Sequence, residues 1–312
     1  MSALIDVILP VFLVMGFGYA ATRMALLSEP AVDSLMRFAQ NFAVPVLLFR
    51  SIAQLDLSAA YDAGLMISFY TGAFAGFAVC FLGAIFLFRR PVTDAVAIGF
   101  AGLFSNSLLL GLAITERAYG AAALTGNYAI ISIHAPMLYA FGIALMEWAR
   151  TRGHGLSAPR LARQIARTTL TQPLVIGILC GFMVNMAGNP LPSAVWSAVD
   201  MLARSAIPVA IFGLGGVLVR YRIEGDRGPV ALIALASLIL HPAIVYGLGR
   251  WVFGLDTAAL RSAVMTAAMA PGVNAYLFAH MYGVAKRVNA SAVLVATALS
   301  ILTVWGWLHI LP

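Results

Sequence analysis

The sequence predicts an all-α integral membrane protein, and three observations support this prediction. The 312-residue chain is 62% hydrophobic but only 10% charged, with a mean hydropathy of +0.94, whereas soluble domains carry about 25% charged residues. Apolar stretches close to 20 residues long, the length at which a helix crosses hydrocarbon, recur along the chain. Basic residues are concentrated in alternate connections between these stretches, as in helical membrane proteins.

Ten stretches have the length and composition of membrane-spanning helices. The first contains no Lys or Arg before Arg23, so it lacks the basic segment of a signal peptide and is interpreted as a span. In chain order the stretches run roughly over residues 4–22, 32–52, 63–88, 92–113, 121–147, 170–188, 196–219, 229–250, 259–280 and 289–311. Spans 2, 4, 7 and 9 are the least apolar, and turn residues and charges at their ends support their assignment.

The distribution of basic residues predicts the orientation of the spans. Connections 1–2, 3–4, 5–6, 7–8 and 9–10 hold thirteen Lys and Arg residues: Arg23, Arg89, Arg90, Arg150, Arg152, Arg160, Arg163, Arg167, Arg220, Arg222, Arg227, Lys286 and Arg287. The opposite side holds four: Arg50, Arg117, Arg250 and Arg261. Because cytoplasmic loops are enriched in Lys and Arg, both termini are expected outside. The net charge of +7 is then a topology signal, and nucleic acid is not an expected partner.

The longest polar connection divides the chain into two halves. Residues 1–147 and 170–312 each contain five spans, and segment 148–169 between them is expected to be a basic cytoplasmic loop. Since five is odd, a repeated unit would have opposite orientations in the two halves. Three landmarks recur in order: "NFAVPVLLFR" and "ARSAIPVAIFG", which contain Pro45 and Pro208; "GLFSNSLLLG" and "MAPGVNAYLF"; and "RAYG" and "HMYG". The chain is therefore expected to form two inverted five-helix repeats.

Spans 4 and 9 both contain residues that interrupt a helix. These are Ser105, Asn106 and Ser107 in span 4, and Pro271, Gly272 and Asn274 in span 9. A broken helix at membrane depth is tolerated only where its backbone faces protein or a water-filled cavity. The exposed N–H groups at such a break attract anions, a glycine allows a ligand to approach closely, and an asparagine supplies both donors and an acceptor. The sequence therefore predicts an anion site at the two breaks.

These motifs resemble those of the auxin efflux carrier family, which includes bacterial organic-acid carriers and the plant PIN-FORMED proteins. The matching segments, each short and degenerate, together cover almost the whole chain: "NFAVPVLLFRSIA", "SNSLLLGLAITERAYG", "TQPLVIGILCG", "ARSAIPVAIFGLGG" and "MAPGVNAYLFAHMYGV". The resemblance implies ten spans in two inverted repeats, with spans 4 and 9 broken and crossing near the substrate. It also implies a scaffold of spans 1, 2, 6 and 7, which contains Pro45 and Pro208, and a moving transport unit formed by the other spans. A homodimer in the bacterial inner (plasma) membrane is expected on the same ground.

The chain departs from the family pattern in span 4. Where the family is expected to have Gly-Leu-Pro, this chain has Gly111, Leu112 and Ala113. The first break is therefore expected to depend on Gly111 together with the serine–asparagine cluster.

Three further polar residues are candidates for the site. Asn41 lies one turn before Pro45 and is expected to line the same cavity. Asn127 and His134 are seven residues apart in span 5 and share a helix face, and His134 could contact substrate or a proton. The alternative for each asparagine is hydrogen bonding between helices, and the alternative for His134 is packing.

The resulting prediction is a secondary-active carrier or exporter of a small organic carboxylate, such as malonate, malate or an auxin-like acid. Transport would follow alternating access, with an elevator-like movement of one unit past the other. The alternatives are an ion-coupled symporter with a fold like those of bile-acid/sodium symporters or sodium/proton antiporters, and a channel. Coupling to a proton or a sodium ion stays open. The sequence contains no His-Glu-x-x-His or Asp-rich motif, so neither an enzyme nor a cofactor or metal site is expected.

Overall fold

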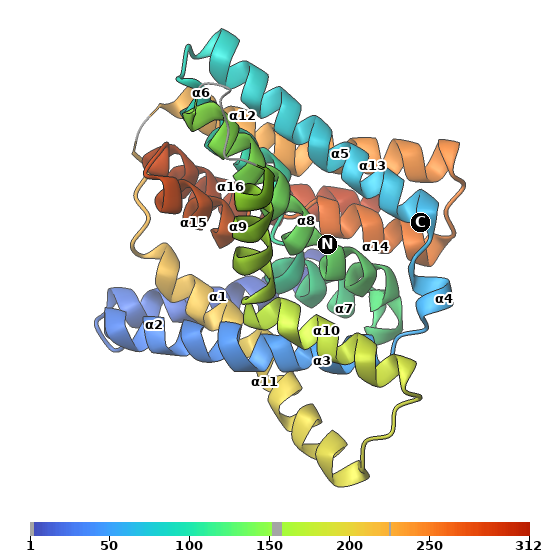
Figure 1. The fold of residues 1–312 in the computed structure, drawn as a ribbon. Helices are drawn as coiled ribbons and strands as arrows, with labels where there is room; N and C mark the ends of the chain where they lie inside the picture. The colour runs from blue at the N-terminus through green and yellow to red at the C-terminus, as the bar shows by residue number, and fades with distance from the viewer. Residues whose placement is uncertain (1–2, 152–157, 225) are drawn as a thin grey trace.

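The computed structural model describes residues 3–151, 158–224 and 226–312, which are helical almost throughout (Figure 1). In these ranges there is no β-strand, and the single β-type pairing is an antiparallel bridge between Ser105 and Pro271. Among the described residues, six helices are long and apolar enough to cross a membrane: Leu4–Arg23, Ala63–Leu87, Thr125–Arg150, Ser193–Leu218, Arg227–Val252 and Lys286–Ile310. The predicted all-helical membrane architecture is thus confirmed.

The four remaining predicted spans are also helical but differ from these six. Span 2 runs as one helical segment from Glu29 to Ala53, through a π-helical turn, and carries several charged residues. Span 6 is short, and spans 4 and 9 are interrupted near their middles.

A first group of helices forms the lower layer in Figure 1. It consists of α1 (Leu9–Arg23), α2 (Glu29–Phe38), α3 (Val44–Ala53), α10 (Pro173–Met186) and α11 (Ser193–Leu218). In it, α11 packs against α1, α2 and α3, and α10 packs against α3. Glycines allow this: a Cβ at Gly215 would overlap the carbonyl oxygen of Met15, and one at Gly177 would overlap that of Pro45. Small residues of this kind let helix backbones approach closely in a membrane, where lipid supplies no hydrophobic driving force.

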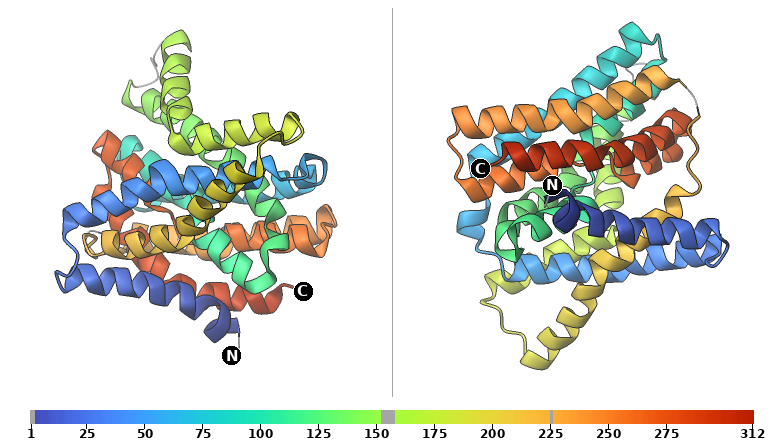
Figure 2. Two further views of the ribbon diagram at one scale, coloured as in Figure 1. Left: turned by 90° about the horizontal axis from the view of Figure 1, so that it is seen from below. Right: turned by 180° about the vertical axis from the view of Figure 1, so that it is seen from behind.

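A second group contains the helices of the other predicted spans (Figure 2). It consists of α5 (Ala63–Leu82), α6 (Val92–Leu103), α7 (Leu112–Tyr119), α8 (Thr125–Arg150), α12 (Arg227–Leu235), α13 (His241–Gly247), α14 (Thr257–Ala267), α15 (Val273–Tyr282) and α16 (Lys286–Ile310). Here α5 packs on α6 and α13, α14 packs on α8 and α13, and α16 packs on α12 and α15. The segments predicted as spans 1, 2, 6 and 7 therefore pack in one group, and the other predicted segments form the second.

Two short helices lie outside the predicted spans, α4 (Leu57–Ala60) and α9 (Ala158–Leu170). Most of α9 lies within segment 148–169, which the sequence predicts to be a basic cytoplasmic connection, and residues 152–157 of that segment lie outside the described residues. The helix is amphipathic: its apolar side chains Leu161 and Ile165 pack against the second group, and its opposite face carries arginines. It meets α10 at a bend of 78°.

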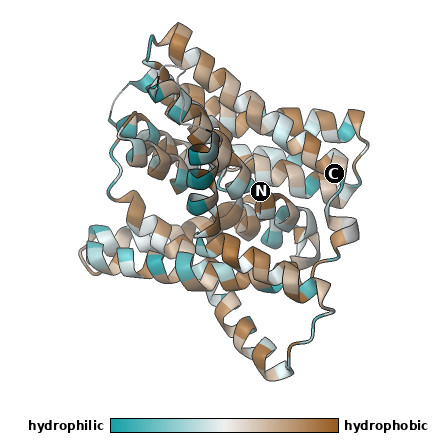
Figure 3. Ribbon diagram, in the orientation of Figure 1, coloured by the Kyte–Doolittle hydropathy of each residue, from teal (hydrophilic) through white to brown (hydrophobic). Residues whose placement is uncertain are grey.

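Hydrophobic residues predominate along the helices of both groups, with hydrophilic residues scattered among them (Figure 3). Large side chains such as Phe17, Phe86 and Trp251 are 65%, 77% and 76% exposed. On a soluble protein, exposed apolar side chains of this number would cause the molecules to aggregate. In a membrane the same side chains contact lipid hydrocarbon, which solvates them well.

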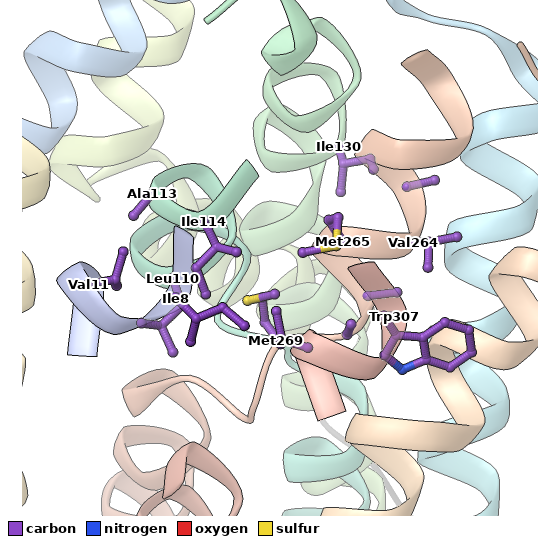
Figure 4. Close-up of a cluster of buried hydrophobic side chains, with 14 of the residues drawn as sticks. Ile8, Val11, Leu110, Ala113, Ile114, Ile130, Val264, Met265, Met269 and Trp307 are labelled. Carbon is purple, nitrogen blue, oxygen red and sulfur yellow. The ribbon is translucent and has the colours of Figure 1, made fainter. Parts of the chain in front are cut away.

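The two groups are in contact where spans 4 and 9 are interrupted. Figure 4 shows part of a buried hydrophobic cluster in which Ile8 and Val11, from the first span, lie with Leu110 and Ile114 of span 4 and Met269 of span 9. Where they face the first span, the breaks in spans 4 and 9 are therefore packed against apolar side chains.

Candidate functional site

The breaks in spans 4 and 9 pair with each other through their backbones. The N–H of Asn106 donates to the carbonyl oxygen of Ala270 at 2.8 Å, and the N–H of Gly272 donates to that of Phe104 at 3.0 Å. These two bonds flank the bridge between Ser105 and Pro271. Lipid cannot satisfy backbone polar groups, and here each broken helix satisfies the other.

Two helices begin at this paired segment. A π-helical turn over Ser107–Gly111 leads into α7, and α15 begins at Val273. The first N–H groups of each helix have no intrahelical acceptor, and neither Asn106 nor Gly272, which precede them, provides a side-chain cap. The partial positive charge at both helix starts suits an anion.

A cavity of about 290 Å³ lies beside the paired segment, between the two helix groups. Small-molecule sites typically have volumes of about 300–1,000 Å³, so this cavity suits a small ligand. Its polar lining residues are Gln40, Asn41, Ser105, Asn106, Ser107, His134, Tyr139, Gln172 and Asn274. The first group supplies Gln40, Asn41 and Gln172, and the second group supplies the others.

Four of the predicted residues come together on the second-group side of this cavity. Asn106 is 8% exposed and Asn274 is half-buried, and neither side chain forms a hydrogen bond with another described residue. Ser105 and Ser107 are buried beside them, with their hydroxyl oxygens 2.7 Å apart. The two amides therefore present free donors and acceptors to the cavity.

Asn41 and His134 also line the cavity. Asn41 is exposed and lies on the first group. His134, on α8, is 3% exposed, and its ring lies edge-to-face with that of Phe104 at a centroid distance of 4.7 Å. Neither ring nitrogen forms a hydrogen bond of normal geometry, although the backbone of Ser105 is close.

The structure places Asn127 away from the cavity. Its side chain is fully buried, and its amide donates to the hydroxyl oxygens of Thr266 at 2.7 Å and Thr115 at 3.3 Å. Asn127 and His134 share a helix, but seven residues correspond to about 10 Å along its axis. The cavity extends along α8 only over Ile131 to Tyr139.

The three predicted backbone positions, Gly111, Gly272 and Pro271, have different surroundings. Gly111 lies inside the continuous helical segment after the first break, and its N–H donates to the carbonyl oxygen of Asn106 at 3.1 Å. The break is therefore at the serine–asparagine cluster alone. Gly272 lines the cavity, and a Cβ added there would meet the Cα of Asn106 at 3.5 Å, an ordinary contact. Pro271 is buried in the bridge to Ser105.

The two prolines of the first group occupy different environments. Pro45 is buried against α10, where its carbonyl oxygen faces Gly177. Pro208 is exposed and lines a second cavity of about 680 Å³, together with Arg50 and Arg204.

A hydrophobic cluster between the two groups borders both cavities. It includes Val44 and Ile131, which line the first cavity, and Leu47 and Leu124, which line the second. Apolar side chains of one cluster thus contribute to the walls of both cavities.

Sequence reasoning missed three polar lining residues, Gln40, Gln172 and Tyr139. Gln40 precedes Asn41, and Gln172 precedes Pro173 at the start of α10, so polarity near a span end was an available signal for both. Nothing in the sequence distinguishes Tyr139 from the other tyrosines.

Comparison with known proteins identifies the family. The family profile described as membrane transport protein matches residues 3–308. Over 311 residues, 100% of this chain and 97% of the relative, the chain is 24% identical to a protein of Rhizobium meliloti (strain 1021) named "Putative malonate transporter". It is 22% identical over 306 residues, 97% and 96% of the two chains, to "Uncharacterized transporter YfdV" of Escherichia coli (strain K12).

A plant protein matches over a shorter region. The chain is 26% identical over 153 residues, 48% of this chain and 42% of the relative, to "Probable auxin efflux carrier component 5a" of Oryza sativa subsp. japonica. Together with the helical spans, these matches show that the protein is a membrane transporter and not an enzyme, and that it belongs to the membrane transport protein family, the auxin efflux carrier family its motifs resemble.

Proposed function

We propose that this protein is a secondary-active transporter of a small organic carboxylate and works by alternating access. One observation carries the proposal: the free amides of Asn106 and Asn274 and two uncapped helix starts meet at one cavity between two helix groups. Because a relative bears the name of a malonate transporter, malonate is the first substrate to test, followed by malate and auxin-like acids.

In the proposed complex the carboxylate accepts hydrogen bonds from both amides. The N–H groups at the start of α15 and at the start of the π-helical turn donate to the remaining lone pairs. Each hydrogen bond to a charged group contributes about 1.5–3 kcal/mol. Ser105, Ser107 and Asn41 complete the polar wall.

For the transport cycle we propose ten spans in two inverted five-helix repeats. The first group, which contains Pro45 and Pro208, acts as the scaffold and the homodimer interface, and the second group moves past it like an elevator. The apolar cluster that borders both cavities supports this proposal. We propose that it closes the path between them and that movement of the second group opens the site to each side in turn.

The proposed orientation places both termini outside the inner membrane. It rests on the thirteen-to-four distribution of basic residues, and it makes the cavity at Gln172 inward-facing. An Ala166→Cys variant, on the exposed part of α9, should react with an impermeant reagent only in inverted vesicles. Labelling in intact cells would contradict the orientation.

A thermal-shift screen of the purified protein against organic acids tests the substrate class. A ligand that binds only the folded state raises the melting temperature by mass action. We expect malonate or a related carboxylate to do so and amines of equal size to have no effect. Stabilisation by amines alone would contradict the proposal.

Flux measurements distinguish the carrier from a channel. In liposomes we expect saturable uptake that labelled substrate on the opposite side accelerates by exchange. A disulfide joining α11 to the π-helical turn before α7, which contact each other, should abolish uptake and preserve ligand binding. Continuous single-channel current, or full flux in the cross-linked protein, would exclude alternating access.

A further inference from the structure

The cavity that we propose for the carboxylate has no charged side chain. Among its described lining residues there is no Lys, Arg, Asp or Glu. An anion there would meet only amide and hydroxyl dipoles and the partial charges of two helix starts. Removing a carboxylate from water without a full countercharge costs several kcal/mol. The site therefore needs a positive charge to bind an anion tightly.

His134 is the basic side chain that could supply the missing charge. It lines the cavity at 3% exposure, and both ring nitrogens lack a hydrogen-bond partner of normal geometry. Leaving a buried polar group unpaired costs about 1–3 kcal/mol, so these nitrogens gain from a partner that the free protein does not provide. A carboxylate in the cavity would be such a partner.

Aromatic rings surround His134. The rings of Phe104, Phe69 and Tyr70 lie at centroid distances of 4.7, 5.6 and 6.3 Å, with Phe104 and Phe69 in edge contact. Aromatic rings in this arrangement pack well against a neutral imidazole. None of the described residues that line the cavity is acidic, so none of them would hold His134 permanently charged.

The other titratable groups near His134 are committed to other contacts or are neutral. His241 on α13 packs on Phe69 at 4.9 Å, and its Nε2 lies 3.2 Å from the Phe69 carbonyl oxygen. The hydroxyl of Tyr70 donates to the carbonyl oxygen of Ile130, and that of Tyr61 pairs with Ser132 on α8. Tyr139 lines the cavity on the same helix as His134.

From this geometry we infer that His134 takes up one proton together with the carboxylate, so that the protein is a proton-coupled carboxylate transporter. The proton comes from water on the loading side, binds a ring nitrogen and hydrogen-bonds to the carboxylate. It returns to water on the other side when the carboxylate leaves. One proton therefore crosses the membrane with each substrate, and the inference rests on the proposed function.

Reconstituted wild-type protein tests this directly, with malonate as the probe. In liposomes that contain a pH-sensitive dye, external malonate should acidify the lumen, and an inward proton gradient should drive malonate accumulation. Malonate uptake without acidification, and without response to the gradient, would overturn the inference and leave the proposed function standing. If neither malonate nor any other carboxylate binds or is transported, both are overturned.

The pH dependence of binding tests the role of His134 itself. Between about pH 7 and about pH 9 malonate is fully ionised and its own charge does not change. If binding takes up one proton, the affinity of the wild-type protein for malonate should therefore weaken as the pH rises, by at most about tenfold per pH unit. In His134→Gln the affinity should equal the high-pH value of the wild type and be independent of pH. His134→Asn provides a second variant should the first fail to fold.

The exposed His280 on α15 provides the matched control. His280→Gln should retain the wild-type pH dependence. A pH dependence that persists unchanged in both folded His134 variants would overturn the assignment.

Discussion

Two buried polar clusters lie at the broken spans, and they differ in how completely their hydrogen bonds are made. On the cavity side, the amides of Asn106 and Asn274 have no side-chain partner among the described residues. Behind the break, Asn127 donates to the hydroxyls of Thr115 and Thr266, which lie on α7 and α14. One cluster has unused hydrogen-bonding capacity for a ligand, and the other connects the two broken spans to α8.

The comparison shows that polarity alone does not identify a binding residue in a membrane protein. All three asparagines lie in or beside the broken spans, and each is costly to bury in hydrocarbon. Their roles differ because their hydrogen-bond partners differ. A side-chain donor that is already bonded within the protein stabilises the protein, while a donor without a partner is available to substrate. The predictions below test this distinction, beginning with the largest expected effect.

Asn106→Ala and Asn274→Ala should each weaken malonate binding by roughly ten- to a hundredfold, because each removes a donor worth about 1.5–3 kcal/mol. The melting temperature without ligand should stay close to that of the wild type, since neither side chain holds the protein together. Titration of purified variants with malonate, with melting curves in parallel, measures both quantities. A lower melting temperature with unchanged affinity would reverse the assignment and make these asparagines structural.

Asn127→Ala should have the opposite result. It removes two hydrogen bonds between neutral groups, together worth about 1–2 kcal/mol, so the free energy of unfolding should fall by about that amount. Malonate affinity should be within a factor of about two of the wild type. A large loss of affinity in a protein of normal stability would place Asn127 in the substrate site after all.

Thr266 and Thr115, the two hydrogen-bond partners of Asn127, should contribute unequally to the free energy of unfolding. Thr266 accepts from Asn127 at 2.7 Å and donates to the carbonyl oxygen of Ser262 at 2.6 Å, whereas Thr115 accepts at the longer distance of 3.3 Å. Thr266→Val should therefore cost about 1–1.5 kcal/mol of stability and Thr115→Val about 0.5 kcal/mol. Equal effects of the two replacements in denaturation measurements would show that the cluster does not act through these hydrogen bonds.

Gly272→Ala should have the smallest effect, although Gly272 lies at the centre of the second break. Its φ of −73° is ordinary for any residue, and the added Cβ would only touch Asn106 at 3.5 Å. We expect a change in stability within about 0.5 kcal/mol and less than a threefold change in affinity. A much larger loss of binding would mean that substrate does approach this backbone, as the sequence alone suggests.

Much of the cavity could be predicted from sequence because helix-breaking and polar residues are conspicuous in an apolar span. Ser105, Asn106 and Asn274 were identified on that ground, and they do line the cavity. The break in span 4 was less predictable: Gly111 weakens a helix in general, yet here it lies within one, since backbone pairing with span 9 places the interruption five residues earlier.

The sequence by itself determined the class of the protein, because hydropathy, span length and the positions of charges depend on local composition. Only the tertiary structure decided which polar side chains form hydrogen bonds within the protein and which have no partner there. One partner of Asn127 is Thr266, 139 residues away, and the partner of the Asn106 N–H is Ala270. Such pairings depend on how two broken helices from distant parts of the chain are placed side by side. The same asparagine side chain consequently stabilises the protein in one position and faces the cavity in another.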